Sequence, residues 1–135
     1  MKHLSPFAIS LLAAAVALVG CHHKPKPRPA VTGTLNYDKF VVPPGCSIEV
    51  RLDDVTVTNT PEFSLARQYI DPRESSPIPF RLHYEPKSIN QAHKYAVSAR
   101  ISCGAELRMI SDGSVPVLTQ GNPTQINLTL KPALR

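Results

Sequence analysis

The sequence predicts an all-β domain, an antiparallel β-sandwich of immunoglobulin-like or transthyretin-like type with seven to eight short strands. Three observations support this prediction. Apolar and polar residues alternate in several segments, which is the period of a half-buried strand. Proline and glycine turns separate these segments at spacings of about ten to fifteen residues. No segment after residue 30 has the apolar spacing of an amphipathic helix. A small closed barrel is the alternative architecture.

The N-terminal segment, residues 1–20, has the features of a secretory signal peptide. Lys2 supplies positive charge, and residues 7–19 form an apolar stretch too short to span a membrane comfortably. The ending Leu18-Val19-Gly20-Cys21 resembles the lipobox of bacterial lipoproteins. That resemblance implies cleavage before Cys21, a diacylglycerol thioether on its sulfur and acylation of the new N-terminus. An ordinary cleaved signal, in which Cys21 has no role, is the alternative.

The composition of residues 21–30 predicts a short tether between this cysteine and the domain. Prolines alternate there with Lys24, Lys26 and Arg28, a pattern that favours a semi-rigid polyproline II conformation. These cations account for most of the formal net charge of +5, because eleven Lys and Arg face ten Asp and Glu from residue 31 onward. A folded part so nearly neutral argues against nucleic-acid binding.

The domain, residues 31–135, begins with two predicted strands. Residues 31–37 alternate, and Pro43-Pro44-Gly45 forms a turn because proline presets one backbone angle and glycine supplies a positive φ. In residues 48–52, apolar and polar side chains then alternate without interruption. The alternation changes phase at Asp53-Asp54, which predicts a bulge or bend.

In the middle of the domain, the pattern of apolar residues predicts a weaker strand over residues 63–70 and a stronger one over residues 78–84. The polar segment between them, residues 71–77, is expected to be exposed. Pro79 places the second strand at a sheet edge or marks its beginning, because proline lacks an amide hydrogen. One short helical turn is expected near residues 88–90.

The last part of the chain predicts four more β segments. Residues 95–101 form a strong strand, and a shorter one follows around residues 107–109. Residues 115–118 form a short edge-like piece because Pro116 interrupts them. After a turn at residues 121–123, residues 126–130 form the final strand.

Two cysteines remain for the folded domain, Cys46 and Cys103, in what the signal predicts to be an oxidising compartment. Cys46 points inward at the start of its strand, and Cys103 points inward at the end of its own. If the two strands are antiparallel, both thiols lie at the same end of the domain, and a disulfide is geometrically reasonable. Two buried free thiols are the alternative.

The sequence contains weak signals for catalysis or metal binding. His83 and His93 do not have the spacing of a metal site, although Glu85 is near, and His22-His23 are read as tether residues. A phosphate loop, a nucleophile elbow and zinc-type cysteine pairs are all missing. We therefore expect no catalytic residues, no metal and no cofactor beyond the lipid on Cys21. No small-molecule substrate is expected.

Several short sequence segments, taken in their order along the chain, resemble segments of the lipoprotein chaperones, or pilotins, of type III secretion and of the related YbaY-type envelope lipoproteins. The resemblance covers residues 31 to about 130 and rests on turn formers and apolar framework positions. The phrases are VTGTLNY (31–37), VPPG (42–45), IEVRLDDV (48–55), PIPF (77–80), YAVSARI (95–101) and VPVLTQG (115–121).

This resemblance implies an all-β adaptor and no enzyme. The implied role is to bind a secretin subunit in the periplasm and, through the lipid on Cys21, to bring it to the outer membrane for assembly. His22, rather than aspartate, follows Cys21, which by resemblance to enterobacterial sorting rules implies the outer membrane. The expected partners are the membrane and a secretin subunit.

Two other roles remain open at this stage. The first is a general envelope lipoprotein of the YbaY type, with a binding or structural role unrelated to secretion. The second is a small-molecule or inhibitor-type binding protein that uses the loops at the end of the domain, with residues 71–77 as the recognition loop. For a pilotin, the proline-marked strands near Ile78 and Val115 are the expected edges for peptide binding.

Overall fold

The computed structural model describes residues 17, 19–37, 43–57, 63–71 and 76–134. These residues form eight strands and one short 3₁₀ helix, η1 (Pro86–Ser88). The strands are β1 (Ala30–Asn36), β2 (Cys46–Asp54), β3 (Phe63–Ile70), β4 (Ile78–His83), β5 (Tyr95–Cys103), β6 (Glu106–Ser111), β7 (Val115–Val117) and β8 (Gln125–Pro132). The signal-peptide prediction falls mostly on residues 1–16 and 18, which lie outside the described residues.

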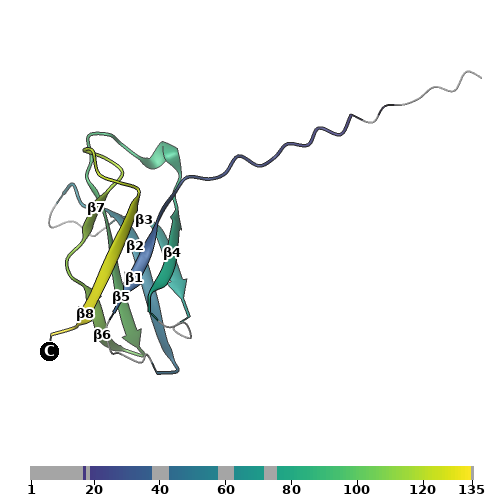
Figure 1. Cartoon of the computed structure of the whole chain (residues 1–135). Coiled ribbons are helices and arrows are strands. Elements are labelled where there is room, and N and C mark those ends of the chain that lie inside the picture. The colour runs from purple at the N-terminus through teal and green to yellow at the C-terminus, as the bar shows by residue number, and fades with distance from the viewer. Residues whose placement is uncertain (1–16, 18, 38–42, 58–62, 72–75, 135) are drawn as a thin grey trace, which may run out of the picture.

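The strands form one curled sheet in the order β3-β2-β5-β6-β8-β1-β4, with β7 paired to β5 beside this path. Neighbouring strands are antiparallel except β1 and β8, which run parallel. Figure 1 shows the sheet curling around its own core, so that the molecule resembles a barrel. The two terminal strands of the path, β3 and β4, come together at a seam.

The all-β class and the prediction of seven to eight strands are confirmed, and so is the short helical turn. The irregularity predicted at Asp53-Asp54 is a shift in the register of β2 against β3, in which the extra residue is Leu65 of β3. The sandwich of immunoglobulin-like or transthyretin-like type is not confirmed, because the sheet is nearly closed and barrel-like. The reason lies in β8. Its first residues pair with β1 and its last residues pair with β6, so one strand joins what would otherwise be two separate sheets.

Alternation builds the core. In β4, the inward residues Ile78, Phe80 and Leu82 are buried, whereas the residues between them are exposed. The same alternation in β2, β5 and β8 fills the interior with aliphatic side chains. The fully buried aliphatic residues are Val31, Leu35, Ile48, Val50, Leu52, Ile78, Leu82, Val97, Ile101, Val117 and Leu128. Strand β1 contributes Val31 and Leu35 at either side of a glycine.

Gly33 lies where β1 passes closest to β8. Its register partners are Phe80 on β4 and Ile126 on β8. A Cβ atom at Gly33 would lie 1.7 Å from the carbonyl oxygen of Ile126 and 2.9 Å from Cζ of Phe80. The first contact is with backbone, which cannot rotate out of the way. The close approach that brings β8 against β1 therefore requires glycine at this position.

We predict that Gly33→Ala destabilises the domain by about 3 kcal/mol or more, because β1 and β8 must separate to admit the methyl group. Urea unfolding followed by far-UV circular dichroism measures the effect. Gly104→Ala is the matched control, since its Cβ would meet nothing within 4 Å and only the positive φ of 61° opposes it. That control should lose about 1–2 kcal/mol. Equal losses for the two variants would contradict the close-approach argument.

Candidate functional site

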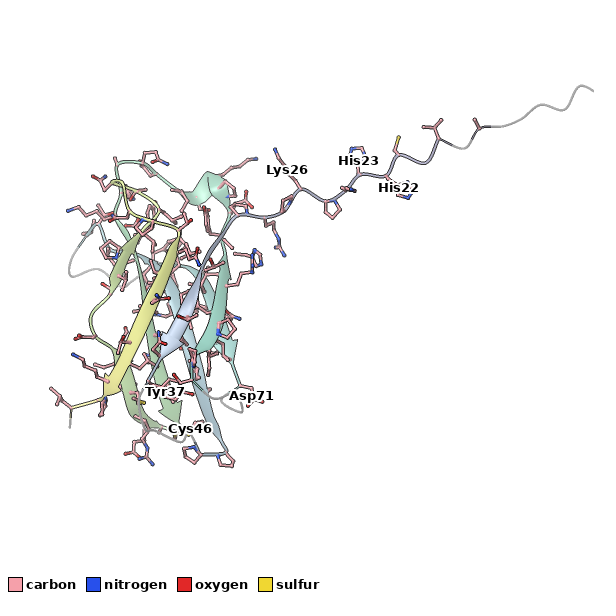
Figure 2. All side chains as sticks on the ribbon, viewed as in Figure 1. His22, His23, Lys26, Tyr37, Cys46 and Asp71 are labelled. Carbon is pink, nitrogen blue, oxygen red and sulfur yellow. A yellow bond between two sulfur atoms is a disulfide. The ribbon has the colours of Figure 1, made fainter. Side chains whose placement is uncertain are left out.

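The tether is extended and exposed from Cys21 to Arg28. Figure 2 shows it running away from the domain, with His22, His23 and Lys26 along its length. It joins the domain firmly, because the amide of Tyr84 donates a hydrogen bond to the carbonyl of Pro29 at 3.3 Å, directly before β1 begins. Within the described part of the chain, no helix has the length and apolar character needed to cross a bilayer.

Cys21, the predicted lipidation site, is an exposed free cysteine at the outer end of this tether. The chain between Cys21 and Ala30 makes no element of secondary structure. A group attached to its sulfur would meet no obstruction from the folded domain. The modification itself stays a prediction.

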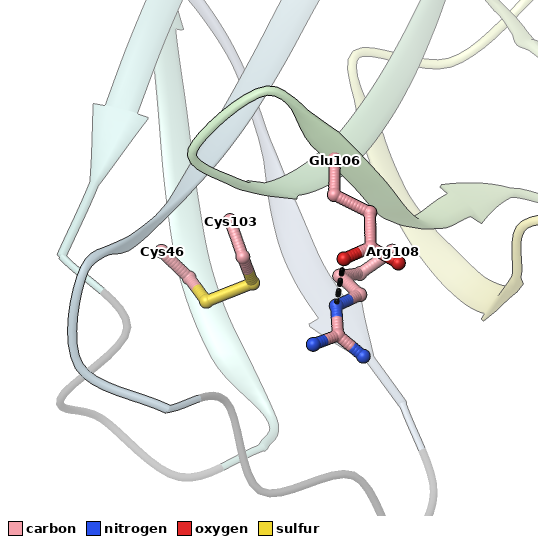
Figure 3. Close-up of a disulfide and its surroundings, with 4 residues drawn as sticks. All are labelled: Cys46, Cys103, Glu106 and Arg108. Atoms are coloured by element: carbon pink, nitrogen blue, oxygen red, sulfur yellow. Dashed lines mark ion pairs between the residues drawn. A yellow bond between two sulfur atoms is a disulfide. The ribbon is translucent and has the colours of Figure 1, made fainter.

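Cys46 and Cys103 are joined by a disulfide in the structure (Figure 3). They are direct register partners on the antiparallel strands β2 and β5. The bond therefore links two neighbouring strands of one sheet. Beside it, Arg108 and Glu106 form an ion pair at 3.5 Å. Cys46 lies at the end of the domain opposite the tether (Figure 2), so the disulfide closes the end of the sheet that is far from Cys21.

The described residues contain no cluster of three or more potential metal ligands, and His83 and His93 lie in no such cluster. Instead, Nδ1 of His93 lies 2.7 Å from Oδ2 of Asp54. The amide of Thr56 donates to Oδ1 of Asp54 at 3.0 Å, and its hydroxyl donates to the same oxygen. His83 is exposed at the end of β4.

These contacts set the charge of Asp54. Burial raises the pKa of its carboxyl, but the two hydrogen bonds from Thr56 and the interaction with His93 outweigh burial and lower the pKa below 3.8. Asp54 therefore acts as a structural anion that fastens the end of β2 to the segment before β5. It is not positioned as an acid catalyst.

The sequence analysis missed a chain of charges along the outward side of β2. Arg100 donates to Oε2 of Glu49 at 2.9 and 3.3 Å. Arg51 lies 3.8 Å from Oε1 of Glu49 and 3.1 Å from Oδ2 of Asp53. Glu49 and Asp53 are only 7% and 4% exposed, so they require these cations. The signal was present as three charged residues of alternating sign at positions 49, 51 and 53.

A hollow of about 240 Å³ adjoins this charge chain, bounded by Glu49, Arg100 and Ile110 among others. A second cleft of about 370 Å³ crosses the outer sides of β4, β1 and β8. Its lining includes Thr32 and Thr34 of β1, Asn127 of β8 and Gln68 of β3, and Arg81 is its one charged side chain. The first hollow also contains the hydroxyls of Ser98 and Ser111, but its carboxylate and its two arginines are engaged in the ion pairs described above. The hydroxyl of Ser111 accepts a hydrogen bond from the amide of Ala99 at 3.1 Å.

The seam between β3 and β4 is the third feature. The amide of Arg81 on β4 donates to Oε1 of Gln68 on β3 at 2.7 Å. A side chain thus takes the place of a ladder bond between the two strands. The proline-marked strands behave as predicted: β4 ends the sheet path, and β7 pairs only with β5. The predicted recognition loop lies mostly outside the described residues, because residues 72–75 are among those not described.

Comparison with known proteins decides the family. The sequence model of the type III secretion system lipoprotein chaperones (YscW) matches residues 26–130, which include every strand but the last two residues of β8. The chain belongs to this family. The resemblance stated from the sequence is therefore confirmed, and the family is one of chaperones and pilotins and not a class of enzymes.

Two relatives extend this result. The chain is 31% identical over 107 residues to an uncharacterized lipoprotein, YbaY, of Escherichia coli K12. The alignment covers 78% of this chain but 56% of the relative, so the chain spans just over half the length of that protein. It also resembles the structure of an alternative pilotin from the type II secretion system of Vibrio cholerae, with a TM-score of 0.73 and 27% identity. That match covers 81% of this chain and all of the pilotin chain, 100%.

We predict that removing the disulfide lowers the free energy of unfolding by about 4 kcal/mol, because the bond closes a loop with a sequence separation of 57 residues. The comparison is between Cys21→Ala and the triple variant that also carries Cys46→Ala and Cys103→Ala, both unfolded in urea. Using Cys21→Ala as the reference removes the third thiol from both proteins. A difference below about 1 kcal/mol would contradict the chain-entropy argument.

We predict that Asp54 contributes to acid sensitivity. Its folded pKa is lowered, so the unfolded chain binds a proton first as the pH falls through 3.8. The stabilisation by Asp54 is present above that pH and is lost as the pH falls through the lower folded pKa. Asp54→Asn should therefore lose less stability than the unmodified protein between about pH 5 and pH 2. Unfolding curves measured across this range test it, and parallel curves would contradict it.

Proposed function

We propose that this protein is a pilotin. In this role it binds a secretin subunit of a type III secretion system in the periplasm, and its lipid carries the pair to the outer membrane for assembly. The match of the family model over residues 26–130 is the observation that carries the proposal. The likeness to a type II pilotin supports it, because a fold shared across two secretion systems is consistent with a shared adaptor role.

The anchor is the first part of this proposed device. Cys21 is exposed and separated from the domain by a tether rich in proline. Fully extended, a polyproline II segment of this length reaches about 25–30 Å. Three acyl chains on Cys21 and its amino group would hold the protein at the membrane essentially permanently. We place it at the outer membrane with the domain in the periplasm, as the residue after Cys21, His22, favours.

The binding domain is the second part. A pilotin needs a stable surface for a segment of its partner, and it needs no catalytic group. Among the described residues, the clefts and the charge chain have the character of binding surfaces or of structural supports. The three cations of the tether add attraction to anionic headgroups, at about 1 kcal/mol for each residue near the surface.

A second candidate is favoured by one specific observation, the similarity to YbaY at 31% identity. In that case the protein is a general envelope lipoprotein with a binding or structural role outside secretion. Lipid anchoring is common to both candidates. Secretin assembly is the property that separates them.

We predict that Cys21→Ala releases the protein from the membrane while the domain still binds its secretin partner. Because the anchor is lost and the binding surface is kept, secretin multimers in the outer membrane should fall to the level of a deletion strain. Membrane fractionation, co-purification with the secretin and immunoblots of unheated outer-membrane samples measure the three effects. His23→Ala is the matched control, because it changes an exposed tether residue and leaves Cys21 and the disulfide in place.

Three outcomes would contradict parts of this account. If Cys21→Ala fractionates with the membrane as before, the lipid anchor is ruled out. Normal secretin multimers in a deletion strain would rule out the type III pilotin role and favour the second candidate. Normal type III multimers together with lost type II multimers would assign the pilotin to the other secretion system.

A further inference from the structure

The second cleft lies on the outer face of three neighbouring strands, β8, β1 and β4 (Figure 1). These three strands contain no Asp or Glu along their whole length. Arg81 is exposed, and among the described residues its guanidinium makes no ion pair. Asp112 lies beside β8, but its carboxylate is held by Lys131 at 2.7 Å. The lining of the cleft therefore carries one uncompensated positive charge.

Two side-chain amides in the lining are oriented so that their nitrogens are left to donate. Oε1 of Gln68 accepts the backbone amide of Arg81 at 2.7 Å, an orientation fixed by the bond because a backbone N–H can only donate. Oδ1 of Asn127 accepts the hydroxyl of Thr34 at 2.8 Å. Within the described part of the chain, the nitrogens of these two amides have no hydrogen-bond partner.

The lining is thus rich in hydrogen-bond donors around a single arginine. The hydroxyl of Thr32 and the side-chain amide of Gln125 complete its polar part. Such a set is complementary to the oxygens of an anion, and the planar guanidinium binds phosphate through two parallel hydrogen bonds. The volume of about 370 Å³ lies in the range of small-molecule sites, roughly 300–1,000 Å³. A phosphate that carries a polar substituent therefore suits the cleft better than a bare ion.

The cleft opens close to the point where the tether joins the domain. Arg81 pairs with Thr32, two residues after Ala30, the first residue of β1. That separation is about 7 Å along a strand. In the proposed lipidated form, the tether holds the domain within about 25–30 Å of the bilayer and adds three cations on the same side. Phospholipid headgroups are the phosphates that this arrangement concentrates beside the cleft.

We propose that this cleft binds the phosphate of an anionic phospholipid headgroup. Arg81 binds the phosphate oxygens, and the amide nitrogens of Gln68 and Asn127 donate to the remaining oxygens of the headgroup. The domain then lies with the outer face of β8, β1 and β4 on the membrane. This inference goes beyond the pilotin function, because no secretin takes part in it. The lipid as the source of the phosphate rests on the proposed anchor at Cys21, whereas the phosphate chemistry rests on the cleft.

The test uses the exported Cys21→Ala protein, in which no acyl chain contributes to binding. It should co-sediment with vesicles that contain phosphatidylglycerol and not with vesicles of phosphatidylcholine alone. Arg81→Gln should weaken this binding by about twenty-fold or more, because it removes hydrogen bonds to a charged group as well as a charge. Arg67→Gln is the matched control on β3, exposed and outside the lining. It loses only general attraction to the surface, which is about five-fold at most.

A neutral substitution separates recognition of the headgroup from general attraction. Asn127→Ala removes an amide donor and no charge, and it should weaken binding about five-fold. Thr129→Ala, at an exposed position of the same strand outside the lining, should leave binding unchanged. All variants should keep the far-UV circular dichroism spectrum of the parent protein.

Soluble glycerol phosphate distinguishes the bilayer from a free phosphoester. In a titration followed by NMR, the side-chain amide signals of Gln68 and Asn127 should shift, and the affinity should be weaker than for vesicles. Glycerol phosphate that binds as tightly as vesicles would assign the cleft to a free phosphoester and overturn the choice of lipid.

Three further outcomes would overturn the proposal. The first is a parent protein that does not bind the anionic vesicles. The second is an equal loss for Arg81→Gln and Arg67→Gln, or no loss for Asn127→Ala, which would reduce the face to a general positive surface. The third is normal vesicle binding by Arg81→Gln together with lost secretin binding, which would assign the cleft to the partner protein. The pilotin function is read from secretin multimers and stands or falls separately.

Discussion

The fold depends on the contact between Gly33 and the carbonyl of Ile126. It allows β1 and β8 to run side by side in parallel, although every other neighbouring pair is antiparallel. With β8 held there, its last residues reach β6, and the strands become one curled sheet. A side chain at position 33 would push β8 away from β1, and the path from β3 to β4 would divide in two. The barrel-like shape follows from a position with no side chain.

Much of this fold could be predicted from the sequence because alternation is a local property. Residues 63–70, predicted as a strand, match β3, and the change of phase at Asp53-Asp54 matches the shifted register of β2 and β3. The pairing of strands is not local. The parallel match of β1 with β8 joins residues more than ninety positions apart, and no turn between them fixes it. The sequence therefore favoured a sandwich, and the structure has a barrel-like sheet.

The candidate sites divide in the same way. Cys21 could be chosen from a short motif, and Cys46 and Cys103 from the inward parity of two strands, which the register places opposite one another. The charge chain and the seam could not be predicted from the sequence. Glu49 and Arg51 have the parity of a solvent-facing surface, and only the placement of Arg100 on β5 makes the carboxylate of Glu49 a buried ion. Gln68 looks like any polar residue of a strand until β4 is set beside it.

The incomplete closure of the sheet leaves this small domain with strand edges that need protection. A fully closed barrel has no free backbone, and an open sandwich exposes long edges that invite aggregation. Here β4 is guarded by Pro79 and by Gln68, β3 carries a bulge at Leu65, and β7 is interrupted by Pro116.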